Sequence, residues 1–97
     1  MNLSKSKKNL LRYLGKAYTC KVIDLEPCLY RNFGDHDVEI SGGSYRRPFH
    51  IYVWMTSPHL QIVERHMNLK HDFEAIKELL DDIDNRYQNL SPDSTNA

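Results

Sequence analysis

Five histidines and two cysteines are the residues of this chain whose side chains could bind a metal ion or carry out catalysis. They are His36, His50, His59, His66, His71, Cys20 and Cys28. No histidine pair has three intervening residues, and neither cysteine lies at a zinc-ligand spacing. His36, between Asp35 and Asp37 in a predicted turn, is a weak indication of a divalent-ion or proton-binding spot. We therefore expect structural or solvated histidines, no bound metal and no cofactor.

Motifs that mark common enzyme classes are not found in the sequence. There is no Gly-x-Ser-x-Gly elbow, phosphate-binding loop, dinucleotide fingerprint or recognisable pair of catalytic carboxylates. Both cysteines fall in segments that favour strands, where they are more typical of buried packing residues than of nucleophiles. Groups that meet only in three dimensions leave no such mark. We expect a protein that is not an enzyme.

A basic helical face near the start of the chain is a candidate nucleic-acid-binding surface. Leu3, Leu10, Leu14 and Ala17 fall on one side of a helix at 100° per residue. The opposite side carries Lys5, Lys8, Arg12 and Lys16, with Lys7 on the flank. Arg46 and Arg47 follow Tyr45, an interleaving of aromatic and basic residues that suits single-stranded nucleic acid. The competing interpretation is an ordinary solvated face, which the zero net charge favours.

An acidic helical face near the end of the chain is a candidate protein-binding surface. It consists of Glu74, Glu78, Asp81 and Asp82. These carboxylates could dock on a basic partner or imitate a row of DNA phosphates. The alternatives are solvation, or ion pairs with Lys77 and Arg86 of the same helix. A further alternative is that the basic N-terminal half of the chain neutralises them.

Residues 48–55 form the strongest predicted strand, and both of its faces are apolar. One face carries Phe49, Ile51, Val53 and Met55, whereas Tyr52 and Trp54 share the other. A strand of this kind requires cover on both sides. We expect the N-terminal helix or a partner protein to cover Tyr52 and Trp54, and in the second case an apolar patch around them.

The remaining segments predict an α+β domain in the order α-β-β-β-β-α. A helix is predicted at residues 5–14, capped by Ser4 and Gly15, and another at about 70–89. Strands are predicted at 17–25, 37–41, 48–55 and 60–67, with 28–31 a candidate for another short one. Residues 60–67 also fit a helix that begins at Ser57, with Pro58 in its first turn. We expect a mostly antiparallel sheet of about four strands, with the C-terminal helix on one face.

Length and composition are those of one small domain. With 97 residues the chain has room for a single modest core, which we place at residues 1–90, followed by a polar tail at 91–97. Residues 1–48 carry nine Lys/Arg against five Asp/Glu, and residues 49–97 carry four against eight. No apolar run is long enough for a secretory signal or a membrane span. We expect a soluble, cytoplasmic protein that does not act at a membrane.

These observations favour a small, non-catalytic protein-binding or regulatory module whose partner is another protein. The alternative is a nucleic-acid-binding protein that uses the basic helix together with Arg46 and Arg47. No known family is recognised from the residues. By its size and opposed charges alone, the chain resembles small accessory or inhibitor proteins encoded by phages and mobile elements. The sequence does not specify an oligomeric state.

Overall fold

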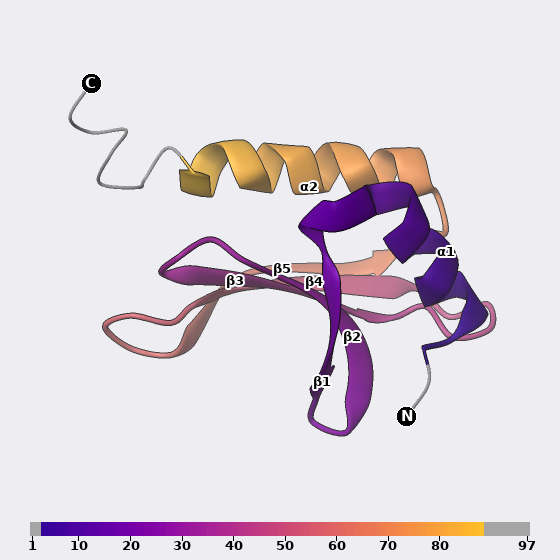
Figure 1. Ribbon diagram of the computed structural model, residues 1–97, viewed down its shortest axis with the longest axis horizontal. Coiled ribbons are helices and arrows are strands. Elements are labelled where there is room, and N and C mark those ends of the chain that lie inside the picture. The colour runs from indigo at the N-terminus through magenta and orange to yellow at the C-terminus, as the bar shows by residue number, and fades with distance from the viewer. Residues whose placement is uncertain (1–2, 89–97) are drawn as a thin grey trace.

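The computed structural model of the protein describes residues 3–88, in which two helices flank five strands (Figure 1). The elements are α1 (Lys5–Leu14), a 3-10 turn η1 (Gly15–Ala17), β1 (Thr19–Ile23), β2 (Glu26–Asn32), β3 (His36–Gly42), β4 (Phe49–Met55), β5 (Gln61–Leu69) and α2 (Phe73–Gln88). The predicted α+β class and element order are confirmed. The sheet has five strands where about four were expected, because residues 26–32 form a full strand. The tail predicted at 91–97 lies outside the described residues.

The five strands form an antiparallel meander in which each strand pairs with the next along the chain. The predicted strand at 17–25 is too long, because Asp24 and Leu25 form the turn between β1 and β2. Both residues have positive φ, 49° and 68°, and Ile23 pairs with Glu26 across them. Two consecutive positive φ angles are typical of the tight turn that matches the twist of a hairpin.

Strand β5 decides between the two interpretations of residues 60–67. It pairs with β4 from Phe49 opposite Leu69 to Met55 opposite Gln61, with two register shifts along the ladder. The strand prediction is therefore confirmed and the helix beginning at Ser57 is wrong. Successive side chains of β5 alternate between the two faces of the sheet, as a strand requires. Glu64 and His66 lie on the helix side, and Arg65 lies on the other side.

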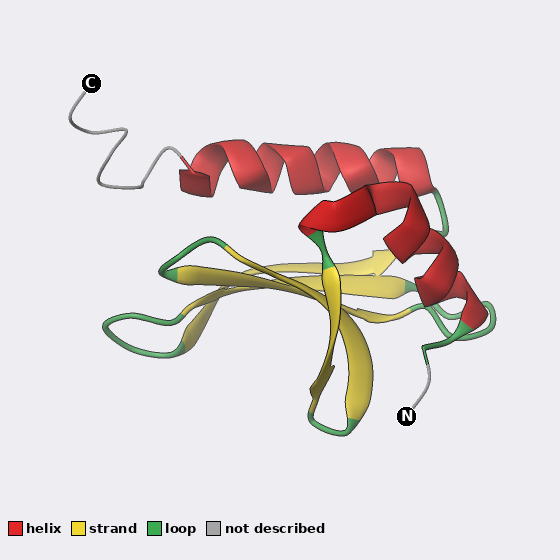
Figure 2. Ribbon diagram, in the orientation of Figure 1, coloured by secondary structure: helices red, strands yellow, loops and turns green. Residues whose placement is uncertain are grey.

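Both helices pack on the same face of the sheet, and the core lies between these two layers (Figure 2). The sheet contributes Leu29, Val38, Ile40, Phe49, Ile51 and Val53, and the helical layer contributes Leu10, Ile76, Leu80 and Ile83. The predicted common face of Phe49, Ile51 and Val53 is thus confirmed, and it is the face that packs against the helices. Neither helix of the described chain is long and apolar enough to span a membrane.

Helix α1 begins and ends at the predicted residues. Ser4 caps it by accepting a hydrogen bond from the amide of Lys7, and Gly15 follows its last residue with a φ of 82°. Of the two alternatives for covering Tyr52 and Trp54, the one that assigned this role to the N-terminal helix is wrong. Because α1 joins α2 on one face, no helix of residues 3–88 covers the face that carries Tyr52 and Trp54.

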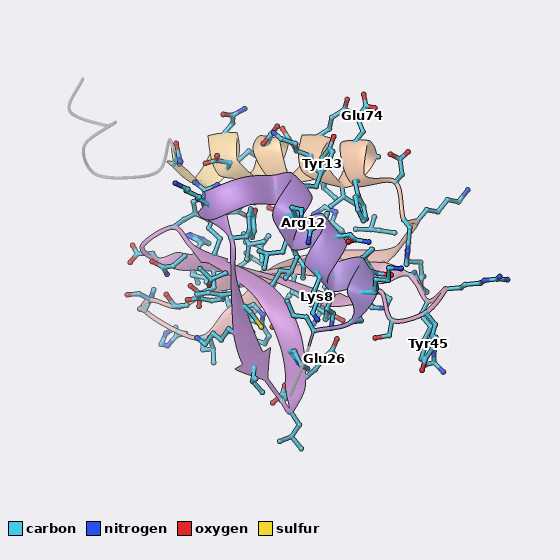
Figure 3. The ribbon with its side chains drawn as sticks, turned by 45° about the vertical axis from the view of Figure 1, so that its right-hand side comes forward. Lys8, Arg12, Tyr13, Glu26, Tyr45 and Glu74 are labelled. Carbon is cyan, nitrogen blue, oxygen red and sulfur yellow. The ribbon has the colours of Figure 1, made fainter. Side chains whose placement is uncertain are left out.

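Lys7 is buried, although the sequence pattern placed it beside the basic face. It is 2% exposed, and its ammonium lies 2.8 Å from Glu26 Oε2 and 2.6 Å from the carbonyl oxygen of Pro27. The same carboxylate oxygen accepts a hydrogen bond of 2.7 Å from the amide of Gly42. Glu26 thereby joins α1, β2 and the end of β3, below α1 in Figure 3.

Candidate functional site

The open face of the sheet contains a hollow of about 450 Å³. The β1–β2 hairpin extends from the sheet on the side away from the helices (Figure 1), and it forms one wall of the hollow. The floor consists of side chains from β2, β3 and β4, and the β4–β5 loop completes the rim. The lining residues are Lys21, Val22, Ile23, Asp24, Tyr30, Asp37, Glu39, Trp54 and Leu60.

The register of the strands explains why these side chains meet. Asp37 lies opposite Trp54 on β4, and Glu39 lies opposite Tyr52 on β4 and Tyr30 on β2. All five side chains therefore point away from the helices, because residues paired across a sheet share a face. The wall and rim add apolar groups, of which Leu60 is 71% exposed and Val22 is 51% exposed.

Hydrogen bonds within the floor hold its aromatic and acidic groups in place. The indole Nε1 of Trp54 donates to Glu39 Oε1 over 3.2 Å. The hydroxyl of Tyr30 donates to Asp37 Oδ1 over 2.9 Å, and the amide of Asn32 donates to the same oxygen over 2.6 Å. The floor thus presents rings and carboxylates whose orientation is fixed by hydrogen bonds.

Glu39 is the least accessible charged group of the hollow, with 8% of its surface exposed. Burial raises the pKa of its carboxyl above the ordinary value, and the carboxylates of Glu26 and Asp24 add to this effect. The hydrogen bond from Trp54 opposes the rise without cancelling it. Glu39 is therefore a carboxylate whose charged form would be stabilised by an incoming cation.

The two predicted parts of the protein-binding surface lie on opposite sides of the molecule. Tyr52 and Trp54 are half-buried on the open face, whereas Glu74, Glu78, Asp81 and Asp82 are exposed on α2. Figure 3 shows Glu74 pointing away from the sheet. Asp81 pairs with Lys77 at 3.0 Å and Asp82 with Arg86 at 3.6 Å. Two of the four acidic residues thus form ion pairs within α2, as in the alternative that named Lys77 and Arg86.

The predicted basic residues are all exposed. Lys5, Lys8 and Arg12 lie on α1, Lys16 lies in η1, and Arg46 and Arg47 lie in the β3–β4 loop. That loop, marked by Tyr45 in Figure 3, is at the same end of the molecule as the start of α1. Within residues 3–88, none of these six cations takes part in an ion pair.

The histidines and cysteines have different surroundings in the part of the chain that the structure describes. No group of three or more His, Cys, Asp or Glu side chains able to hold a metal is found there. The ring of His36 packs against Tyr87 at 4.4 Å. Cys28 is buried, and this burial, followed by the nearby Glu26 and Glu39, raises the pKa of its thiol to about 12. Cys20 was expected to be buried but is exposed on the edge strand β1.

Sequence reasoning selected Trp54 but missed the acidic and aromatic residues beside it. Asp37 and Glu39 alternate with the core residues Val38 and Ile40, and alternation of this kind is also typical of side chains exposed to solvent. The missing information was the pairing of β3 with Tyr30 on β2 and with β4. Such a pairing depends on turn lengths and register, which alternation within one strand does not report.

Comparisons with protein-family models, with curated proteins and with solved structures give no match. The fold and the site therefore define the class of this protein by themselves. It is an α+β domain with a five-stranded antiparallel meander, two helices on one face and a hollowed, partly aromatic opposite face.

Proposed function

We propose that this chain is a small, non-catalytic module that binds another protein through the open face of its sheet. The observation that supports this most is the hollow itself. The residues that could have closed it, those of α1, pack on the other side, and the rim keeps Leu60 and Val22 exposed. Exposed apolar side chains gathered on one face are typical of interaction surfaces.

A single charge placed on the rim tests this proposal. The Leu60→Asp variant should reduce partner binding at least about tenfold, since it removes an apolar contact and buries a carboxylate on association. The measurement is the quantity of each protein retained by the immobilised chain from extracts of cells that naturally encode it. Tyr45→Asp is the matched control, because Tyr45 is 92% exposed in the β3–β4 loop and has a positive φ that aspartate tolerates.

The expected result is a set of proteins held by the wild type and by Tyr45→Asp but lost with Leu60→Asp. Equal retention by all three proteins would show that the open face is not the contact surface. Loss of retention with Tyr45→Asp alone would move the contact to the β3–β4 loop and contradict the proposal.

A second candidate function is nucleic-acid binding, favoured by the six exposed cations that lack ion-pair partners within residues 3–88. It predicts that the affinity for a labelled single-stranded oligonucleotide falls steeply between about 50 and 200 mM salt. Fluorescence anisotropy measures this affinity. The Lys8→Gln/Arg12→Gln variant should reduce it and flatten its salt dependence. Binding unchanged by the double substitution would eliminate the basic helix as the surface.

A further inference from the structure

The carboxylates of the hollow have no cationic partner in the described part of the protein. Asp24, Asp37 and Glu39 line the hollow together with one cation, Lys21, and none of the three forms an ion pair within residues 3–88. Each floor carboxylate also keeps one oxygen, Asp37 Oδ2 and Glu39 Oε2, that accepts no hydrogen bond from the described residues. An unpaired charge on a side chain as buried as Glu39 is costly, and a cation that arrives from outside would relieve that cost.

The aromatic floor is suited to the same kind of ligand. A cation is attracted to the face of a tryptophan or tyrosine ring, and more strongly where water is displaced. The chain already contains one such contact, since Lys21 Nζ lies 4.3 Å from the centroid of the Tyr30 ring. Trp54, which lies on β4 opposite Asp37, is partly exposed. Its ring has no such contact with a cation of the described chain.

The spacing of the carboxylates favours a guanidinium over an ammonium. Asp37 and Glu39 are two residues apart on one strand, so their Cα atoms are separated by roughly 6.6 Å. A guanidinium presents five donors in a plane, which allows it to reach two carboxylates while it stacks on a ring. An ammonium is a compact charge that serves one carboxylate at a time.

We propose that the hollow binds an arginine side chain of the partner protein, with the guanidinium donating to Asp37 and Glu39 and lying against Trp54. This inference rests on the proposed function and names the group that the open face recognises. Because three carboxylates without ion-pair partners line the hollow, the partner that it fits is a basic segment of another protein.

The protein contains a single tryptophan, which makes the test direct. The indole N–H resonance of Trp54 is followed by NMR while the capped peptide acetyl-Gly-Arg-Gly-amide is added to the full chain. We expect a saturable shift of this resonance, with a dissociation constant of about millimolar for so small a ligand. The matching peptide with citrulline, which has the same shape without the charge, should give no saturable shift. The lysine peptide should bind at least several-fold more weakly than the arginine peptide.

Two substitutions and one control separate binding from folding. Glu39→Gln should weaken the arginine peptide at least about tenfold, because it removes a charged acceptor. Asp37→Asn, in which the tyrosine contact keeps an oxygen acceptor, should weaken it in the same direction. Glu78→Gln removes an exposed carboxylate of α2 and should leave the affinity unchanged. The dispersion of the amide resonances shows whether each variant is folded, and if Glu39→Gln is not folded, Asp37→Asn decides.

Several results would overturn the inference. These are equal shifts with the citrulline and arginine peptides, equal affinities for lysine and arginine, or an affinity that the folded floor variants do not change. Each of them leaves the proposed function separately testable, since the Leu60→Asp retention experiment does not depend on a cation. Loss of partner retention with Leu60→Asp, combined with no arginine binding, would mean that the partner uses the apolar rim alone.

Discussion

Replacing Glu26 with alanine is expected to lower the free energy of unfolding by about 3 kcal/mol, a large part of the stability of a small domain. The substitution leaves the ammonium of Lys7 without a counter-charge, and the side chain of Lys7 is only 3% exposed. It also removes the acceptor of the Gly42 amide. The side chain of Glu26 is 43% exposed, so water partly replaces it, and the expected cost is therefore at the lower end for a broken buried pair.

The pair should respond asymmetrically, which distinguishes a buried charge from a surface salt bridge. Lys7→Met should cost only about 1 kcal/mol, since Glu26 keeps the Gly42 hydrogen bond and its exposure to water. The double variant Lys7→Met/Glu26→Ala should then be more stable than Glu26→Ala alone. Urea unfolding followed by circular dichroism gives all four free energies. Equal and small costs for the two single substitutions would contradict the role assigned to Lys7.

The pKa of Glu26 is consistent with this role. Burial on its own would raise the pKa of the carboxyl, but the hydrogen bonds from Lys7 and Gly42 and the charge of Lys7 lower it on balance. A group whose pKa is lower in the folded than in the unfolded state stabilises the fold above its ordinary value of 4.5, and that contribution is lost as the pH falls through the folded pKa. Glu64 of β5 also has a lowered pKa. Burial raises the pKa of this carboxyl, but Tyr87, His66 and Arg86 lower it on balance. Glu64 therefore adds to the loss of stability expected as the pH falls.

The helices and strands were predictable because each leaves a periodic mark in its own segment. The cap residues Ser4 and Gly15 and the apolar spacing of α1 define that helix without reference to the rest of the chain. The alternation of Phe49, Ile51 and Val53 defines β4 and its inward face in the same way. The segment at 17–25 was misjudged at its end, because Leu25 is a strand-forming residue that adopts a positive φ in a turn.

The site was predictable only in part, since it depends on relations between elements. That α1 would pack beside α2, and so leave Tyr52 and Trp54 open, follows from the path of the chain after Gly15 and leaves no periodic pattern. Lys7 shows the same limit, because its helical position fits a basic flank equally well until Glu26 is placed opposite it. The composition of the hollow required the register of three strands, which brings Glu39 opposite Tyr30 and Asp37 opposite Trp54.

The charged surfaces of the protein are separate in space, and this limits how one partner could use them. The acidic residues of α2 lie above the helical layer and the hollow lies below the sheet, as Figure 1 shows for the two layers. The acidic row that would imitate DNA is interrupted, because Asp81 and Asp82 are paired with cations of α2. A partner that binds the open face is therefore free to do so without contacting the outer surface of α2.

Replacing Gly43 with alanine is expected to lower the free energy of unfolding by about 3 kcal/mol. Gly43 has a φ of 76°, which a residue with a side chain adopts at a cost of about 1 kcal/mol or more. A Cβ at this position would also lie 2.1 Å from Cε1 of Phe49, a core residue that is fully buried. Moving that ring adds the cost of overpacking, typically about 1–3 kcal/mol.

Gly34→Ala is the matched control, because Gly34 has nearly the same φ of 79° but has no atom within 4 Å of the added Cβ. It should cost about 1 kcal/mol, the contribution of the backbone alone. Urea unfolding measures the free energy of unfolding of both variants. Their difference reports how rigidly the ring of Phe49 is held between the β3–β4 loop and α2. On the α2 side, the centroid of this ring lies 6.4 Å from that of Phe73. If Gly43→Ala lowers the free energy of unfolding no more than Gly34→Ala does, the ring of Phe49 moves aside at little energetic cost. Phe49 would then not be the fixed point that joins the start of β4 to the helical layer.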